Sequence, residues 1–422
     1  MATCGLDFGT SNSAVALPSG DVLRIDHANA EPRLFRSVLF FPEQTSGYSA
    51  GATAIEEYLQ RSEGRFIQSI KGWLASGSFT ATQIRGKPFK LEDLVAMLLR
   101  AIRERAEAAA GATLDDVTLG RPAVFATDPS HDALAERRLL RAAELAGFKR
   151  IRFLIEPIAA ALAYEATLTR DELVLVADFG AGTSDLTIMR LGPSRRGAQD
   201  RRADVVASGG VAIGGDRFDA EIMRHKLLRH FGHGSTYEVM QKRMVVPMSI
   251  LGRLLSWHEM SFIRERATQQ LIDRILYGSD DVPAIEALYD LVEENLGYRL
   301  FRAIEGAKIR LSSADETRIE FHEARIDIDE PITRADFERF SQPLLDELSA
   351  CTARVLDEAR VGSDEIQSVF LTGGSSQIPA VRQLFAARFG EGKLRTADAF
   401  TSVAEGLGRS RGEDIAGAAR EG

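Results

Sequence analysis

An identical Asp-Phe-Gly triplet occurs twice in the chain, each time where an apolar strand pattern breaks into a small, hydroxyl-containing turn. The first copy begins at Asp7, in CGLDFGTSNSAVAL, and the second begins at Asp178, in LVLVADFGAGTSDLTIMR. A separation of this length is too long for a solenoid repeat and fits a duplicated domain. We therefore expect two lobes that each contribute one strand–turn–strand device to a shared cleft.

The chemistry of these turns predicts what the cleft holds. A carboxylate within an apolar strand must face solvent, a cation or several donors. Glycines let the backbone approach an anion closely, and hydroxyls add further donors. A carboxylate beside such a turn would repel phosphate unless Mg²⁺ lay between them. The pattern indicates a phosphate site in two halves, although either copy taken alone is equally typical of a Gly-rich hairpin. It is not a Walker loop, because G-x-x-x-x-G-K-[ST] is absent from the sequence.

Composition and charge exclude several other classes of protein. The 422 residues carry a net charge of −9 and no basic block, which argues against a nucleic-acid partner. No apolar run is long enough to cross a bilayer, and the N-terminus enters a strand without a signal-peptide pattern. The two cysteines lack metal-ligand spacing. We expect a cytoplasmic protein with no membrane association.

Strand and helix patterns alternate along the first half of the chain. The expected elements are a β meander at 4–41, a helix at 90–110 ended by Gly111, a strand at 116–126, a helix at 131–148, a strand at 151–157 and a helix at 159–166. This alternation predicts an α/β layer architecture.

The second half repeats the plan with a long helical interruption. Strands are expected at 173–191 and 203–208, and again at 317–328; a helix is expected at 335–361, and a strand, Gly-Gly turn and helix at 366–390. Residues 220–312 have a helical period almost throughout and show no strand signal.

Six segments, in order, carry a resemblance to a known family. They are GLDFGTSNSAVAL, the stretch 120–165 with its Glu-Pro-x-Ala-Ala-Ala-Leu-Ala-Tyr run, VLVADFGAGTSDLTIM, IGGDRFDAEIM, RAIEGAKIRLSS and FLTGGSSQIPAVR. Together they resemble the nucleotide-binding domain of Hsp70 chaperones, within the actin/sugar-kinase/Hsp70 ATPase superfamily, over about residues 4–408. A chain with this domain alone is similar to the YegD-like branch.

The resemblance implies a two-lobed, actin-like ATPase fold built from duplicated ribonuclease-H-like domains. Lobe I would span 1–170, with a peripheral subdomain at about 38–116. Lobe II would span 171–422, with an enlarged helical subdomain at about 215–330 and a C-terminal helix packing back toward lobe I. No peptide-binding domain is expected.

The resemblance also implies roles for individual residues. Asp7 and Asp178 would hold hydrated Mg²⁺, Lys71 would neutralise the transferring phosphoryl group, and Glu156 with Asp178 would orient the attacking water. Thr183 would be a further catalytic residue. Phosphate contacts would come from Asp7, Gly9, Thr10, Ser11, Asn12, Gly180, Ala181, Gly182, Thr183, Gly214 and Gly215, and adenosine contacts from Glu305, Lys308, Ser312, Gly373, Gly374 and Ser375. The implied cofactors are ATP or ADP and Mg²⁺, with K⁺ as a further candidate cation.

Two positions depart from the family pattern around adenosine. Ile309 and Gln377 stand where the family has arginines that would sandwich the adenine. A planar cation over a base is worth roughly 0.5–2 kcal/mol, so these changes predict weaker ATP binding or a relaxed base preference.

The expected function is an ATP-binding, slowly ATP-hydrolysing switch related to Hsp70 chaperones, without a substrate-binding domain. Lobe closure would signal to a protein partner, with the helical insertion at about 233–290 as its candidate surface. One alternative is a non-catalytic, nucleotide-sensing or filament-forming actin-like scaffold. A small-molecule kinase is less well supported, because no second catalytic Asp is placed to activate an acceptor hydroxyl.

Overall fold

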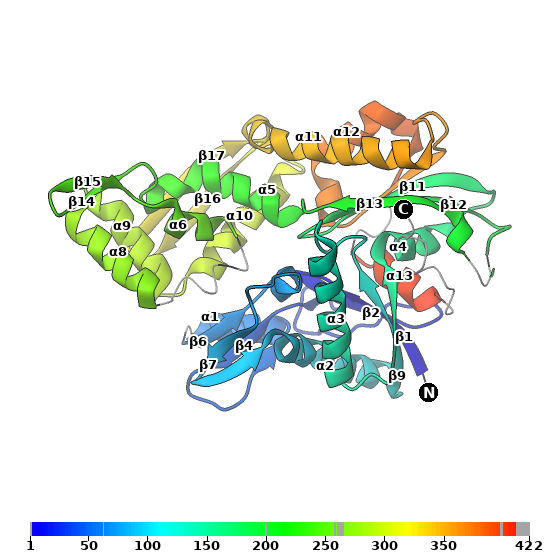
Figure 1. Ribbon diagram of the computed structural model, residues 1–422, viewed down its shortest axis with the longest axis horizontal. Coiled ribbons are helices and arrows are strands. Elements are labelled where there is room, and N and C mark those ends of the chain that lie inside the picture. Colours follow the sequence, from blue (N-terminus) through cyan, green and yellow to red (C-terminus); the bar gives the residue numbers. More distant parts are fainter. Residues whose placement is uncertain are drawn as a thin grey trace. The chain divides into compact units, whose positions relative to one another are not determined.

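The computed structural model describes residues 2–61, 63–196, 198, 201–256, 259, 266–396 and 400–410. The chain forms two compact units (Figure 1), of which unit 1 comprises residues 1–214 and 345–422 and unit 2 comprises residues 215–344. The lobe boundary at residue 170 and the subdomain limits expected from the sequence stay predictions. No helix within the described ranges has the length and apolar character needed to cross a membrane.

Unit 1 contains two five-stranded sheets with equivalent strand orders. The first has the order β10-β9-β1-β2-β3, and its strands are Arg150–Ile155, Leu114–Arg121, Ala2–Phe8, Asn12–Ala16 and Phe35–Arg36. The second has the order β19-β18-β11-β12-β13, and its strands are Leu394–Thr396, Ser368–Thr372, Glu172–Phe179, Ser184–Leu191 and Val205–Val211. In each sheet the first strand of the device pairs antiparallel with the second and parallel with a later strand. The predicted duplication is therefore confirmed.

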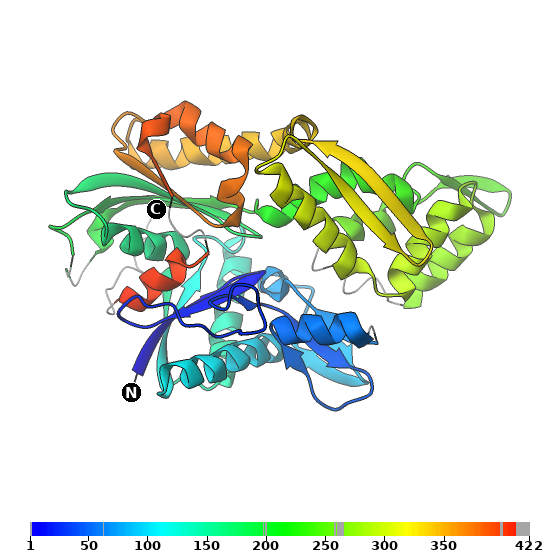
Figure 2. The same cartoon turned by 180° about the vertical axis from the view of Figure 1, so that it is seen from behind.

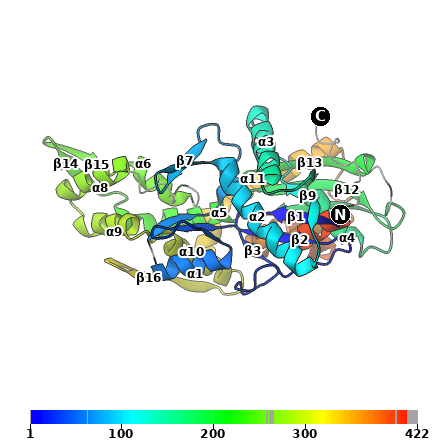
Figure 3. The same cartoon turned by 90° about the horizontal axis from the view of Figure 1, so that it is seen from below.

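Helices pack against the sheets of unit 1 and bury their apolar faces. Those of unit 1 are α1 (Ala52–Arg61), α2 (Leu91–Ala110), α3 (Pro129–Leu145), α4 (Glu156–Glu165), α12 (Pro379–Phe389) and α13 (Ser402–Arg409), and α11 (Arg334–Ala359) begins in unit 2 and ends in unit 1. The α2 helix ends at Gly111, whose φ of 65° is the left-handed conformation that glycine adopts readily. α2 and α3 pack against each other, as Figure 3 also shows.

Helix α13 packs closely against α4 and β1 (Figure 2). A Cβ atom on Gly406 would lie only 1.7 Å from the carbonyl oxygen of Ala159, so the α13 backbone contacts the α4 backbone directly. The run of small residues in α4 permits this approach, because all but one of its side chains are buried. This contact holds the first turn of α4, which begins at Glu156, in place.

A smaller layer of unit 1 carries Lys71. It consists of a sheet of order β5-β4-β6 (Ser49–Ala50, Leu39–Pro42 and Gly64–Ile67) and the hairpin β7–β8 (Ala81–Ile84 and Lys87–Lys90). A 3₁₀ helix, Ile70–Trp73, follows β6 and holds Lys71 in its first turn.

Unit 2 is mainly helical and contains two hairpins. Its helices are α5 (Gly215–Ile222), α6 (Met248–Leu251), α8 (Arg266–Gly278), α9 (Val282–Glu293) and α10 (Gly297–Leu311), and its strands are β14 (Thr236–Val239), β15 (Lys242–Val245), β16 (Glu316–Glu323) and β17 (Ile326–Thr333). Phe218 of α5 packs edge-on against Phe337 of α11 inside this unit. Alternate β17 residues are buried, as its period-2 pattern requires.

The prediction that 220–312 contains no strand is wrong, because β14 and β15 form a hairpin within it. Its two turn residues, Met240 and Gln241, have φ values of 49° and 61°. Such a turn normally carries Asn-Gly, and without that signal the strands were hidden in the sequence.

Candidate phosphate and magnesium site

The two Asp-Phe-Gly strands end at neighbouring turns of unit 1. Asp178 pairs in register with Asp185 on one side and with Thr372 on the other, at the carboxyl end of the parallel pair β11–β18. A Cβ atom on Gly182, in the second turn, would lie 3.5 Å from the hydroxyl of Thr10, in the first. The structure therefore brings the two predicted phosphate turns together.

Glycines permit the tight backbone paths around these turns. A Cβ atom on Gly9 would lie 2.1 Å from the carbonyl oxygen of Asn12, and one on Gly214 would lie 2.3 Å from that of Ala181. Side chains at either position would displace backbone, and such displacement would move N–H groups that could meet an anion.

A buried ion pair joins the small layer of unit 1 to α4. Lys71 Nζ donates to Glu156 Oε1 at 2.7 Å, and each side chain is only 10% exposed. The family resemblance predicted both residues, which are 85 positions apart, as members of one site.

Asp185 interacts with the charges of Lys71 and Glu156, and together with Asp7 and Asp178 these residues form an acidic cluster. The sequence analysis did not identify Asp185 as a site residue. Its Oδ1 accepts from the backbone N–H of Ala123 at 2.8 Å, and its Oδ2 accepts from Thr183 Oγ1 at 2.9 Å. The sequence signal that could have identified it is the second acidic residue of ADFGAGTSD. In the structure this residue lies in register with Asp178. Thr183 is thus held by a carboxylate that itself faces the cluster.

The cluster holds an excess of negative charge. Burial, followed by the charge of Glu156, raises the pKa values of Asp7 and Asp185 from 3.8 to about 7. The same two causes raise the pKa of Asp178 well above its usual value. Burial lowers the pKa of Lys71, but the charges of Glu156 and Asp7 outweigh it, and the net pKa is raised.

This donor set fits a hydrated magnesium ion. Four carboxylates of the described cluster face one ammonium group, so a divalent cation would compensate charges that burial penalises. No group of three or more side chains among the described residues is arranged to ligate a metal ion directly. Mg²⁺ commonly keeps several of its waters and uses one or two carboxylates. Asp7 and Asp178 would hold it in that way.

Arg36 was also missed by sequence reasoning, and the structure places it against the first turn. Its Nη1 donates to Asn12 Oδ1 at 3.0 Å across the β2–β3 pair, and Ser37 N donates to Ser11 O at 3.0 Å. Arg36 forms no ion pair with any described carboxylate. Nothing in the local pattern RLFRSVLFF distinguished this arginine from a solvated one.

The residues expected around adenosine fall in both units. In unit 1, Ser375 Oγ donates to Gly180 O at 3.4 Å, and Gly373, with φ of 80°, passes so close to Phe179 that a Cβ atom would lie 2.2 Å from its carbonyl oxygen. The Gly-Gly turn therefore lies against the second phosphate turn.

In unit 2, Lys308 Nζ pairs with Asp219 at 2.8 Å and donates to Gly215 O at 3.1 Å. The ammonium group of Lys308, which the resemblance assigns to adenosine contact, is therefore already engaged in a buried ion pair. Ile309, the next residue of α10, is 60% exposed and presents an apolar side chain to solvent.

Comparison with known proteins decides the family. The sequence model described as "Hsp70 protein" matches residues 3–248 and 286–408, which is most of the chain. The chain belongs to the Hsp70 family. Its mixed α/β architecture with duplicated sheets is consistent with the fold of that family.

A curated relative supports the family assignment. The chain is similar to the chaperone protein DnaK of Thermus thermophilus, with 27% identity over 428 aligned positions covering 95% of this chain and 59% of the relative. The chain thus spans less than two thirds of that Hsp70 protein's length. The Hsp70 model leaves residues 249–285 unmatched, inside the segment that was predicted to be an insertion.

The acidic cluster predicts a pH dependence of stability. Because the folded state raises the pKa values of Asp7 and Asp185, it binds more protons than the unfolded chain between pH 4 and 7. Their contribution is fully present in acid and is lost as the pH rises through about 7. In EDTA, the melting temperature should fall between pH 5 and 8, and Mg²⁺ should flatten the profile. A melting temperature that rises over this range in EDTA would contradict the assignment.

Proposed function

We propose that this Hsp70-family chain binds ATP with hydrated Mg²⁺ and slowly hydrolyses it to ADP and phosphate. The observation that carries the proposal is the buried Lys71–Glu156 pair within the carboxylate cluster of Asp7, Asp178 and Asp185, beside two adjoining glycine turns. Phosphoryl transfer depends on positioning and charge neutralisation, and these residues supply both.

Each group has a distinct task in this proposal. Backbone N–H groups and hydroxyls of residues 9–12 and 180–183 would hold the phosphates. Mg²⁺ would neutralise charge on the β- and γ-phosphate oxygens. Lys71 would offset the charge that develops on the transferred group, while Glu156 and Asp178 would accept hydrogen bonds from the attacking water and aim it. Asp185 would keep Thr183 oriented.

The proposal extends to a switch. Nucleotide binding and product release would change the equilibrium between conformations, and a protein partner would respond to the favoured state. The partner is a proposal drawn from the family and from the unmatched segment 249–285.

Single-turnover kinetics test the enzymatic part. Protein in excess is mixed with radiolabelled ATP and Mg²⁺, without any acceptor, and inorganic phosphate is measured over time. Slow phosphate release that EDTA abolishes is the expected result. Bound but unhydrolysed ATP would overturn the ATPase proposal and favour a nucleotide-sensing scaffold.

Arg36 gives a test specific to this chain. Its guanidinium donates to Asn12 and forms no ion pair with a carboxylate among the described residues. It should therefore add a charge-assisted hydrogen bond to bound phosphate. Arg36→Met should weaken binding of Mg·ATP about tenfold or more, measured by calorimetry. Arg36→Lys should recover part of the loss.

The matched control for Arg36 is Arg141→Met. Arg141 is exposed, and among the described residues it pairs only with Glu144 on its own helix. Its replacement should leave affinity unchanged. Equal affinities of the Arg36→Met variant and the wild type would remove Arg36 from the site.

A further inference from the structure

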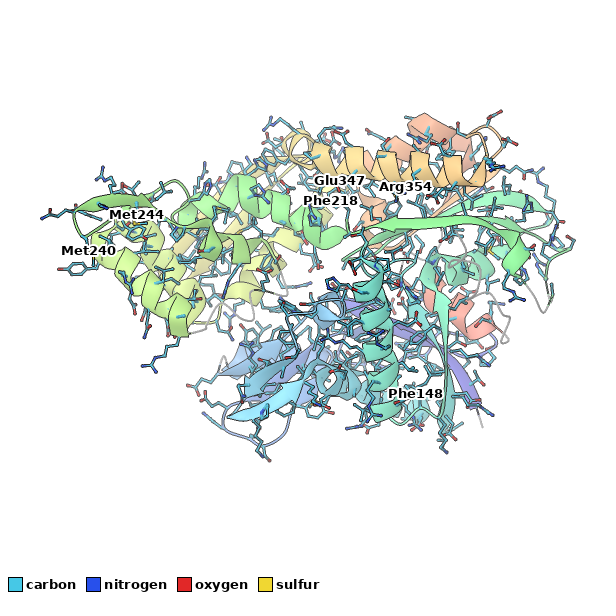
Figure 4. All side chains as sticks on the ribbon, viewed as in Figure 1. Phe148, Phe218, Met240, Met244, Glu347 and Arg354 are labelled. Atoms are coloured by element: carbon cyan, nitrogen blue, oxygen red, sulfur yellow. The ribbon has the colours of Figure 1, made fainter. Side chains whose placement is uncertain are left out.

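The β14–β15 hairpin of unit 2 lies in the most apolar exposed region of the described structure. Six of the eleven exposed large apolar side chains described lie between residues 240 and 282: Met240, Met244, Val245, Met248, Tyr277 and Val282. This region overlaps the segment 249–285 that the family model leaves unmatched. Figure 4 shows Met240 and Met244 at the end of unit 2 that the hairpin forms. A concentration of exposed large apolar side chains in one segment is a feature of interaction sites.

Strand β15 presents an open edge. It pairs with β14, and the opposite side of β14 is bridged at Tyr237 to Ser279, but no other strand of the described ranges pairs with β15. All four β15 residues are exposed. An uncovered edge with apolar side chains is a template for a further strand.

The hairpin register identifies which backbone groups are open. Val246 N donates to Ser235 O at 3.0 Å, so the alternate β15 residues Met244 and Lys242 also face β14. The N–H and C=O groups of Arg243 and Val245 therefore point away from the hairpin. They are the positions at which an added strand would form hydrogen bonds.

The turn places a methionine in an unfavourable conformation. Met240 has a φ of 49° and is 93% exposed. This left-handed conformation is disfavoured for residues other than glycine, and Met240 regains little of the lost stability by burial. A contact formed only with a partner would account for an apolar side chain at this position, and methionine adapts its shape to many apolar surfaces.

Charge defines the partner more closely. Lys242 and Arg243 are exposed and form no ion pair within the described part of the chain, whereas the chain as a whole has a net charge of −9. Along β15 the order is therefore basic, basic, apolar, apolar. Cross-strand neighbours face the same side of a sheet, so an added strand should oppose these residues with two acidic and two apolar side chains.

We propose that the open edge of β15 binds an extended segment of a partner protein as an added antiparallel strand. The segment reads apolar, apolar, acidic, acidic from its N-terminus, opposite Val245, Met244, Arg243 and Lys242. Backbone hydrogen bonds to Arg243 and Val245 supply the affinity, and the side chains select the register and the partner. The proposal deepens the proposed function, on which it rests for its biological use, by naming the partner's chemistry.

The first experiment measures binding of defined peptides without nucleotide. The probe is a fluorescein-labelled decapeptide with the core Ile-Val-Glu-Asp, and the control probe has the core Ile-Val-Lys-Arg. Fluorescence anisotropy should show saturable binding of the acidic probe and about tenfold weaker binding of the basic one. Equal affinities would overturn the proposal.

A charge-swapped protein provides the decisive variant. K242E/R243E should bind the basic probe better than the acidic one, a gain that misfolding cannot produce. The matched control, K87E in the β7–β8 hairpin of unit 1, should retain the wild-type preference. Failure of the swapped variant to reverse the preference would overturn the charge assignment and with it the proposal.

Hydrogen exchange tests the added strand itself. Saturation with the acidic probe should slow amide exchange at Arg243 and Val245, while Met244, whose N–H already faces β14, serves as the internal control. Unchanged exchange at both outward amides would overturn strand addition. Self-association that K242E/R243E abolishes would instead make a second copy of the chain the occupant. Because no nucleotide is present, failure here leaves the ATPase proposal standing, and loss of hydrolysis leaves the peptide site standing.

Discussion

Lys71→Met should lower the single-turnover rate constant for ATP hydrolysis by about 100-fold or more. The ammonium group is buried beside the carboxylates of Glu156, Asp7 and Asp185, so its charge is poorly screened and would act strongly on a nearby phosphoryl group. Methionine keeps much of the side-chain length and removes the charge. Binding of Mg·ATP should weaken less than the rate falls, because the charge matters most as the transferred group departs.

The variant also breaks a buried ion pair, and this effect must be separated from catalysis. Removing Lys71 leaves Glu156 buried without its partner at 2.7 Å, which typically costs about 3–5 kcal/mol of stability. The double variant K71M/E156Q removes both charges and should recover most of the melting temperature. It should not recover hydrolysis.

A lysine outside the cluster serves as the control. Lys149 is 68% exposed, and its buried partner Asp115 also pairs with Arg103 at 3.5 Å, so that carboxylate keeps a cation when Lys149 is replaced. Lys149→Met should leave both the rate constant and the melting temperature near wild type. Full activity in the Lys71→Met variant would remove Lys71 from the catalytic machinery.

Asp178→Asn should have opposite effects on stability and on metal response. Asp178 is buried and its pKa is raised. Folding at neutral pH therefore requires either that this carboxylate takes up a proton or that it stays charged among other carboxylates, and both lower the free energy of unfolding. An amide carries neither penalty, so without metal the variant should be more stable than the wild type. Its melting temperature in EDTA should rise, by about 2–4 °C per kcal/mol.

With Mg²⁺ and nucleotide, the Asp178→Asn variant should show little of the thermal stabilisation that the wild type gains on binding Mg·ATP. The thermal shift produced by Mg·ATP should shrink sharply, because the variant lacks one of the two carboxylates that we propose hold the hydrated cation. Asp364→Asn, at an exposed loop position, should change neither measurement. A variant that is destabilised in EDTA and keeps its full Mg·ATP shift would show that Asp178 has a purely structural role.

The elements whose signals are local were predictable from the sequence. The two strand–turn–strand devices and helices such as α2 depend on apolar period, turn residues and an ending glycine, and each is readable within a short window. Asp7 and Asp178 were identifiable because their own turns were distinctive. Lys71 and Glu156 have no such local signal, and only the family resemblance singled them out.

The β14–β15 hairpin shows where local signals fail. Its strands are four residues long, and its turn lacks the glycine that normally marks one. The burial of Tyr237 and its bridge to Ser279 stabilise the hairpin through contacts distant in sequence. Propensity was therefore overridden by tertiary packing.

The sequence by itself determined the two acidic turns, the alternation of strands and helices, and the residue types needed for phosphate chemistry. Only the tertiary structure decided which residues meet: Lys71 with Glu156 across 85 positions, Asp185 with Ala123, and Arg36 with Asn12. The physical reason is the range of the interactions. Turn conformation and helical period depend on neighbours along the chain, whereas charge compensation in a buried cluster depends on groups that only folding brings within hydrogen-bonding distance.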